Sequence, residues 1–99
     1  MTPEAKVKLV IKDILKELGC YHFSPIGGAY SSRGVPDIIG CLNGVFFGIE
    51  AKAGKGKTTA LQDRELQRIK DAGGIALVVN EENLDSLKTV LMEEIRRRM

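Results

Sequence analysis

The dipeptide Asn43-Gly44 lies between two short apolar runs, and it constrains the fold of this chain more than any other feature. Asn-Gly favours a two-residue hairpin turn, because both residues of such a turn need a positive φ. It therefore predicts a β-hairpin with strands at residues 37–42 and 45–52. A two-residue turn also fixes the register, so Leu42 must pair with Val45.

Counting outward from this turn places Asp37 opposite Glu50, and Lys52 shares the face of Glu50 because side chains alternate along a strand. Two opposed carboxylates destabilise a sheet unless something compensates them. Mg²⁺ or Mn²⁺ is a natural compensation, and the carbonyl of Ala51 offers a further oxygen. The cluster thus predicts metal-dependent phosphodiester hydrolysis, with Lys52 activating the water or stabilising charge on phosphorus. The alternative is an ordinary solvated face, with a bulge that breaks the register.

The rest of the pattern predicts an α/β fold in the order α-β-β-β-α-β-α. The first helix is expected to be capped by Thr2 and ended by Gly19, with a buried stripe of Val7, Ile11, Ile14 and Leu18 and with Leu15 beside it. The other expected elements are a strand at 20–23, a helix at 59–72, an apolar strand at 75–79 and a helix at 83–98. The βαβ connection from the hairpin to the last strand predicts a parallel pair within a central mixed sheet.

Length and composition indicate one domain over residues 1–99, with a formal net charge of only +2. Cys20 and Cys41 are too few for a disulfide framework, which favours a reducing compartment. No signal-peptide core and no apolar run of about 20 residues is present, so we expect a soluble cytoplasmic protein. Five aromatic residues without Trp argue against a surface that reads single strands by base stacking.

Two further polar residues fall on otherwise apolar helix stripes. Glu4 precedes Val7 on the stripe of the first helix, and Gln62 heads the stripe of Leu66, Ile69 and Ala72 on the second. Each has an ordinary explanation as well: Glu4 would compensate the helix dipole, and Gln62 would be solvated. Their positions are nevertheless those of additional site residues.

Gly34-Val35-Pro36-Asp37, followed by Glu50-Ala51-Lys52, resembles the PD-(D/E)xK nuclease signature. The surrounding pattern is similar to the VRR-NUC branch of that superfamily, which has a glutamate on the first helix and a glutamine opening the helix after the motif. Glu4 and Gln62 stand at those positions. The resemblance covers about residues 4–79 and implies a restriction-endonuclease-like core.

The resemblance implies a metal-dependent endodeoxyribonuclease with the catalytic residues Glu4, Asp37, Glu50, Lys52 and Gln62. Asp37, Glu50 and the Ala51 carbonyl would bind Mg²⁺ or Mn²⁺, and Glu4 would complete the site directly or through water. Lys52 and Gln62 would position the attacking water and the phosphate. Stand-alone members resemble Holliday-junction resolvases, which implies a homodimer acting on branched DNA in a bacterial cell or a phage-infected host.

Residues 51–58 also resemble a phosphate-binding loop, with Ala51 in place of the first glycine. A nucleotide-binding module is therefore one alternative, although no later apolar strand ends in an aspartate for the nucleotide's Mg²⁺. Otherwise the loop is a basic segment in which Lys55 and Lys57 hold a DNA phosphate, with Ser31, Ser32 and Arg33 on the other side. A non-catalytic DNA-binding relative is the second alternative. For Arg96–Arg98, a solvated tail is the default interpretation and a contact with DNA is the alternative.

Overall fold

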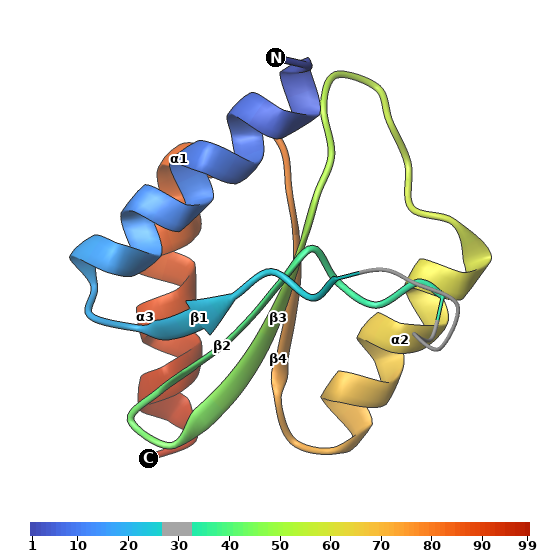
Figure 1. Ribbon diagram of the computed structural model, residues 1–99. Helices are drawn as coiled ribbons and strands as arrows, with labels where there is room; N and C mark the ends of the chain where they lie inside the picture. The colour runs from blue at the N-terminus through green and yellow to red at the C-terminus, as the bar shows by residue number, and fades with distance from the viewer. Residues whose placement is uncertain (27–32) are drawn as a thin grey trace.

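A computed structural model describes residues 1–26 and 33–99, so Ser31 and Ser32 lie outside the described residues. Their predicted contact with DNA is therefore left open. The elements follow the predicted order (Figure 1): α1 (Pro3–Glu17), β1 (Tyr21–Phe23), β2 (Ile38–Leu42), β3 (Val45–Ala51), α2 (Ala60–Asp71), β4 (Ile75–Val79), a 3₁₀ turn η1 (Leu84–Ser86) and α3 (Leu87–Arg97).

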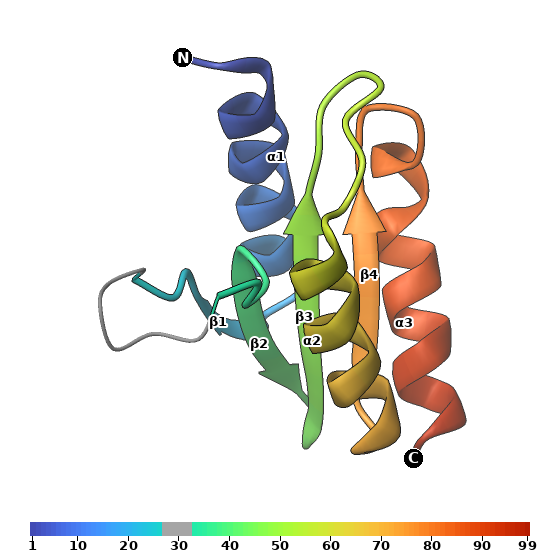
Figure 2. The ribbon, with the colours of Figure 1, turned by 90° about the vertical axis from the view of Figure 1, so that its right-hand side faces the viewer.

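The four strands form one mixed sheet in the order β1-β2-β3-β4. The predicted hairpin register is confirmed, since Leu42 pairs with Val45 and Ile38 with Ile49. Asn43 and Gly44 have φ values of 55° and 78°, as a two-residue turn requires. β3 and β4 run parallel, as the connection through α2 predicted and as their two arrows in Figure 2 show. The hairpin is shorter than expected, because Asp37 lies just before β2 and Lys52 just after β3.

Helices cover both faces of this sheet, as Figure 1 shows with α1 and α3 on one side and α2 on the other. The core lies mainly between the sheet and the α1–α3 pair, where Ile11, Leu15, Phe47 and Leu91 are fully buried. Leu15 thus lies at the centre of the α1 stripe, while Ile14 and Leu18 are only partly buried. The shift arises because α1 contacts β1, β3 and α3, so that its buried stripe is broad.

The helix ends differ slightly from those predicted. Thr2 and Thr59 are the N-caps of α1 and α2, and each accepts a backbone hydrogen bond through its side chain. The last helix begins at Leu87 rather than at Asn83. The Asn83 side chain accepts a bond from the Asn80 N–H and donates one to the Val78 carbonyl, so it closes the turn after β4.

Among the helices in the described ranges, none combines the length and the apolar character that crossing a membrane requires.

Candidate active site

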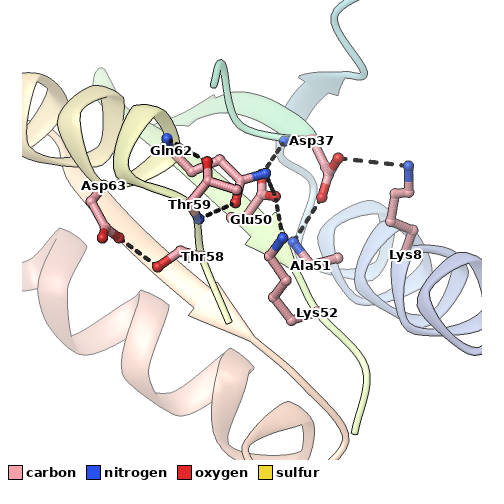
Figure 3. A network of polar contacts seen from close by, with 9 residues as sticks. All are labelled: Lys8, Asp37, Glu50, Ala51, Lys52, Thr58, Thr59, Gln62 and Asp63. Carbon is pink, nitrogen blue, oxygen red and sulfur yellow. Dashed lines mark hydrogen bonds and ion pairs between the residues drawn. The ribbon is translucent and has the colours of Figure 1, made fainter. Parts of the chain in front are cut away.

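The side chains of Asp37 and Glu50 lie at the open end of the β2–β3 hairpin, and each accepts a hydrogen bond from the backbone of the opposite side (Figure 3). The Asp37 N–H donates to Oε1 of Glu50 at 3.2 Å, and the Ala51 N–H donates to Oδ2 of Asp37 at 2.9 Å. These two side-chain bonds continue the pairing of the strands by one residue beyond the ladder. The carboxylates therefore lie together where the register placed them, and no bulge separates them.

Gln62 joins this pair from the first turn of α2. Its Nε2 donates to Oε2 of Glu50 at 2.8 Å, and its Oε1 accepts the N–H of Thr59 at 2.9 Å. The Gln62 N–H in turn donates to Oγ1 of Thr59 at 3.2 Å, which completes a capping box. The same glutamine side chain thus caps the helix and holds Glu50.

Two lysines flank the carboxylates from different elements. Lys52 follows β3, its Nζ lies 3.6 Å from Oε2 of Glu50, and its side chain is only 14% exposed. Lys8 of α1 places its Nζ 3.6 Å from Oδ1 of Asp37. Lys8 was missed by the motif, although it follows Glu4 by four residues and so lies on the same side of the helix.

Glu50 is 3% exposed, and the pKa of its carboxyl is raised to about 7, chiefly by burial. The neighbouring Asp37 charge contributes to this rise, whereas Lys52 and the Asp37 N–H oppose it. Lys52 therefore offsets only part of the effect of burial and of the Asp37 charge on Glu50. Near neutral pH, an additional cation that binds beside these carboxylates would therefore be stabilised by their charge.

Glu4 lies in the first turn of α1 and is half-buried. Its charge helps to raise the pKa of Glu50, but no hydrogen bond or ion pair joins it to the other acids within the described ranges. Across residues 1–26 and 33–99, no three acidic, histidine or cysteine side chains converge as a metal site. Lys8, one helical turn further on, faces Asp37 in place of Glu4.

Asp37 and Glu50 nevertheless fit a hard divalent cation. Mg²⁺ is usually held by one or two carboxylates, with water and substrate phosphate completing its shell. All four carboxylate oxygens already contact protein nitrogens. Each such oxygen offers about two lone-pair sites, so these contacts leave acceptor capacity for a cation.

Gly34 joins the segment before β2 to the start of α2. Its φ is +83°, and a Cβ built on it would lie 2.4 Å from the Leu61 carbonyl oxygen. Only glycine allows this approach, which places the backbone just before Pro36 and Asp37 against the residue that precedes Gln62. The glycine of the sequence signature thus has a packing function.

The loop between β3 and α2 is basic and exposed at Lys55 and Lys57. The Gly54 N–H donates to the Glu81 carboxylate at 2.9 Å, so this amide already binds an anionic group. The helix begins only at Ala60, two residues after Lys57-Thr58. In a phosphate-binding loop the free amides and the helix start would meet at the phosphate, so this geometry counts against nucleotide binding. Arg33, on the other side, is exposed.

Arg98 at the end of α3 is bound within the protein. It pairs with Glu94 at 2.7 Å and donates to the carbonyls of Gly73 and Gly74. Arg97 also contacts Glu94. Arg98 therefore fixes the end of α3 to the turn before β4, whereas the Arg97 pair lies within the helix.

The chain is similar to a known protein at the level of structure. Neither the models of protein families nor the curated proteins include a match to this sequence. A solved structure described as "VRR_NUC domain" superposes with a TM-score of 0.70 at 25% sequence identity. The alignment covers 88% of this chain and 95% of that one.

The mixed sheet flanked by three helices is thus the restriction-endonuclease-like α/β fold that the sequence predicted. The likeness supports a VRR-NUC domain nuclease, the branch that the sequence pattern around Asp37, Glu50 and Lys52 resembles.

Proposed function

We propose that residues 1–99 form a single nuclease domain that hydrolyses DNA phosphodiesters with Mg²⁺ or Mn²⁺. One observation carries the proposal. Asp37 before β2, Glu50 of β3, Lys52 after β3 and Gln62 of α2 form one connected polar cluster. The likeness to a VRR_NUC domain supports this function independently.

Asp37, Glu50 and the Ala51 carbonyl would hold the metal, with Glu4 acting directly or through water. A bound divalent ion polarises the phosphodiester and lowers the pKa of a coordinated water. Gln62 keeps the Glu50 carboxylate in one orientation through its bond at 2.8 Å. Lys52, which lies beside Glu50, would orient the attacking water and stabilise charge on the phosphate.

Lys55, Lys57 and Arg33, with Ser31 and Ser32, are the proposed contacts to the DNA backbone. The two lysines project from the exposed loop between the Lys52 end of β3 and the Gln62 end of α2. Such contacts position a duplex without reading its sequence. The formal net charge of +2 makes a local arrangement of this kind necessary, because the chain as a whole attracts DNA only weakly.

Cleavage of labelled plasmid and oligonucleotide DNA with Mg²⁺ or Mn²⁺ tests the proposal. Asp37→Ala and Glu50→Ala should each abolish cleavage, and Lys52→Ala should lose turnover while retaining DNA binding. Glu93→Ala, which removes an exposed carboxylate from α3, is the matched control and should cleave at the wild-type rate. Circular dichroism should show that all four variants remain folded.

Cleavage that survives both carboxylate substitutions would refute this mechanism. DNA binding without cleavage at any divalent ion would favour the non-catalytic DNA-binding relative. Saturable ATP binding that is lost in Lys57→Ala would favour the nucleotide-binding module instead.

The substrate is proposed to be branched DNA, such as a Holliday junction, bound by a homodimer. This part rests on the resemblance to stand-alone VRR-NUC domains, and two active sites related by a two-fold axis would cut two strands symmetrically. Duplex, flap, splayed-arm and four-way-junction DNA should be compared, each with Mg²⁺ and with Mn²⁺. Light scattering at micromolar concentration should give twice the chain mass, and a monomer mass would contradict the dimer.

A further inference from the structure

A groove of about 1060 Å³ begins at the candidate active site and runs along the sheet. Asp37 and Lys8 line it at one end, and Phe46 and Gly74 line it further along. One wall is α2, through Glu65, Arg68 and Ile69, and the other is the chain at residues 24–26 and 33–36. The volume reaches the upper limit of the usual range for small-molecule sites, about 300–1,000 Å³.

The floor of this groove is apolar and is shaped by two glycines. Gly48 of β3 has no side chain, so Ile69, Pro36 and Ile39 meet over it; a Cβ there would lie 2.7 Å from Cδ1 of Ile69. A Cβ on Gly74 would similarly lie 3.2 Å from Cδ1 of Phe46. The Phe46 ring therefore lies against the Gly74 backbone, and Phe46 remains 45% exposed.

The charged residues of the groove favour an anionic ligand. Lys8, Arg33 and Arg68 line it, opposed by Asp37 and Glu65. Glu65 is paired with two arginines, since its Oε2 lies 2.9 Å from Nη1 of Arg68 and 3.6 Å from Nε of Arg64. The Arg68 side chain is still 68% exposed and retains donors for a phosphate.

An apolar floor between cationic residues fits unpaired nucleotides better than a double helix. A duplex presents phosphates and sugars at its surface and keeps the apolar faces of its bases stacked inside. Only a strand with unpaired bases offers those faces together with phosphates. Five aromatic residues are too few for a long stacking surface, but the single Phe46 ring suffices for one base.

We infer that this groove binds the unpaired bases of a DNA strand next to the cleavage site, with one base against Phe46 and its phosphates near Arg68 and Arg33. The inference rests on the proposed nuclease function. Among branched DNAs it favours those with an unpaired arm, such as a flap or splayed arm, over a fully paired four-way junction. It assigns to Phe46 and Arg68 a binding role that lies outside the nuclease motif.

The test measures binding separately from cleavage. Fluorescence anisotropy with EDTA present compares a blunt duplex with the same duplex carrying a splayed, unpaired thymidine arm. Phe46→Ala should weaken binding of the splayed DNA about five-fold or more, since one base–aromatic stack contributes at least about 1 kcal/mol. Its affinity for the blunt duplex should stay within about two-fold. Phe46→Trp should restore the preference.

Val90→Ala is the matched control, because Val90 is a comparably exposed apolar residue on α3, away from the groove. It should bind both DNAs as the wild type does. Thermal melting of each variant separates loss of contact from loss of fold, and Phe46→Trp keeps the inference testable if Phe46→Ala is unstable.

Two results would overturn the inference. One is equal affinity of the wild type for the two DNAs. The other is an equal loss of affinity for both DNAs in Phe46→Ala. This includes the case in which the variant changes only the oligomeric mass, which would mark Phe46 as part of a protein interface. Neither result would affect metal-dependent cleavage of duplex DNA, and a wild type that cleaves no DNA would refute the nuclease while leaving this binding preference measurable.

Discussion

Gln62 donates from Nε2 to Oε2 of Glu50 at 2.8 Å and accepts the Thr59 N–H through Oε1 at 2.9 Å. Glu50 is buried at the end of β3, and Thr59 is the residue at which α2 starts. The orientation of this carboxylate is therefore tied to the capping of a helix. A change at the helix cap should therefore alter the rate of DNA cleavage.

Thr59→Ala removes the hydroxyl that accepts the Gln62 N–H. Loss of an N-cap side chain costs about 0.5–2 kcal/mol in the free energy of unfolding, which urea denaturation will measure. Since Gln62 then keeps only half of its capping box, kcat for DNA cleavage should fall several-fold. Thr59→Ser should restore both quantities.

Thr58→Ala is the control for this prediction. It removes a neighbouring hydroxyl that donates to Asp63 and that makes no bond to Gln62. It should leave kcat close to the wild-type value. An equal fall in kcat for both threonine variants would show that the loop as a whole, and not the cap, controls the reaction.

Glu50→Gln should make the metal-free protein more stable at pH 8 while abolishing cleavage. The folded-state pKa of about 7 lies above the ordinary value of 4.5, so the folded protein binds the proton more tightly than the unfolded chain. Wild-type stability is therefore lost as pH rises from 4.5 to 7, by about 3 kcal/mol in total. Glutamine carries no charge and avoids this loss.

Urea denaturation with EDTA at pH 8 and at pH 4 checks this sign. The gain of Glu50→Gln over the wild type should be large at pH 8 and nearly absent at pH 4, where Glu50 is protonated in both states. Glu93→Gln, at an exposed position, should show neither change. A gain of equal size at both pH values would contradict the assignment of the effect to a buried charge.

Gly34→Ala should destabilise the protein and reduce cleavage. An alanine at φ +83° costs roughly 1–2 kcal/mol in backbone strain. Its Cβ would also meet the Leu61 carbonyl oxygen at 2.4 Å, which forces the backbone before Asp37 away from α2. Gly44→Ala has a similar φ of +78° but nothing within 4 Å of the added Cβ. The stability that Gly34→Ala loses beyond the loss in Gly44→Ala, measured by urea denaturation, gives the free-energy cost of the clash with α2. An equal loss in both variants would contradict this clash.

Lys8→Ala should tighten Mn²⁺ binding a few-fold and weaken DNA binding. Lys8 lies 3.6 Å from Oδ1 of Asp37, so its charge competes with a cation for that carboxylate. Electron paramagnetic resonance of free Mn²⁺ measures the first effect. If Lys8 also contacts a phosphate, the slope of log K against log salt should fall by about 0.9.

Lys88→Ala supplies the comparison for Lys8, because Lys88 pairs with Glu17 on the surface at 3.8 Å, away from the carboxylates. It should change neither Mn²⁺ affinity nor the salt slope. Weaker Mn²⁺ binding in Lys8→Ala would show that Lys8 supports the metal site rather than competing with it.

The sequence by itself determined the elements and the pairing of the two acids. Asn43-Gly44 fixes a two-residue turn, and the turn fixes the register out to Asp37 and Glu50, because strand pairing is a matter of counting. The parallel placement of β4 followed in the same way from the helix that connects it to β3. The motif also identified Gln62, whose contact with Glu50 the structure contains.

Only the tertiary structure decided which side chains from separate helices meet this pair. Helical spacing placed both Glu4 and Lys8 on one side of α1, but the packing of α1 against the sheet brings Lys8 to Asp37. The burial that raises the pKa of Glu50 likewise depends on the elements that enclose it. Local patterns set register and helix faces, whereas the angle and depth at which helices pack depend on the whole core, which no short stretch of sequence contains.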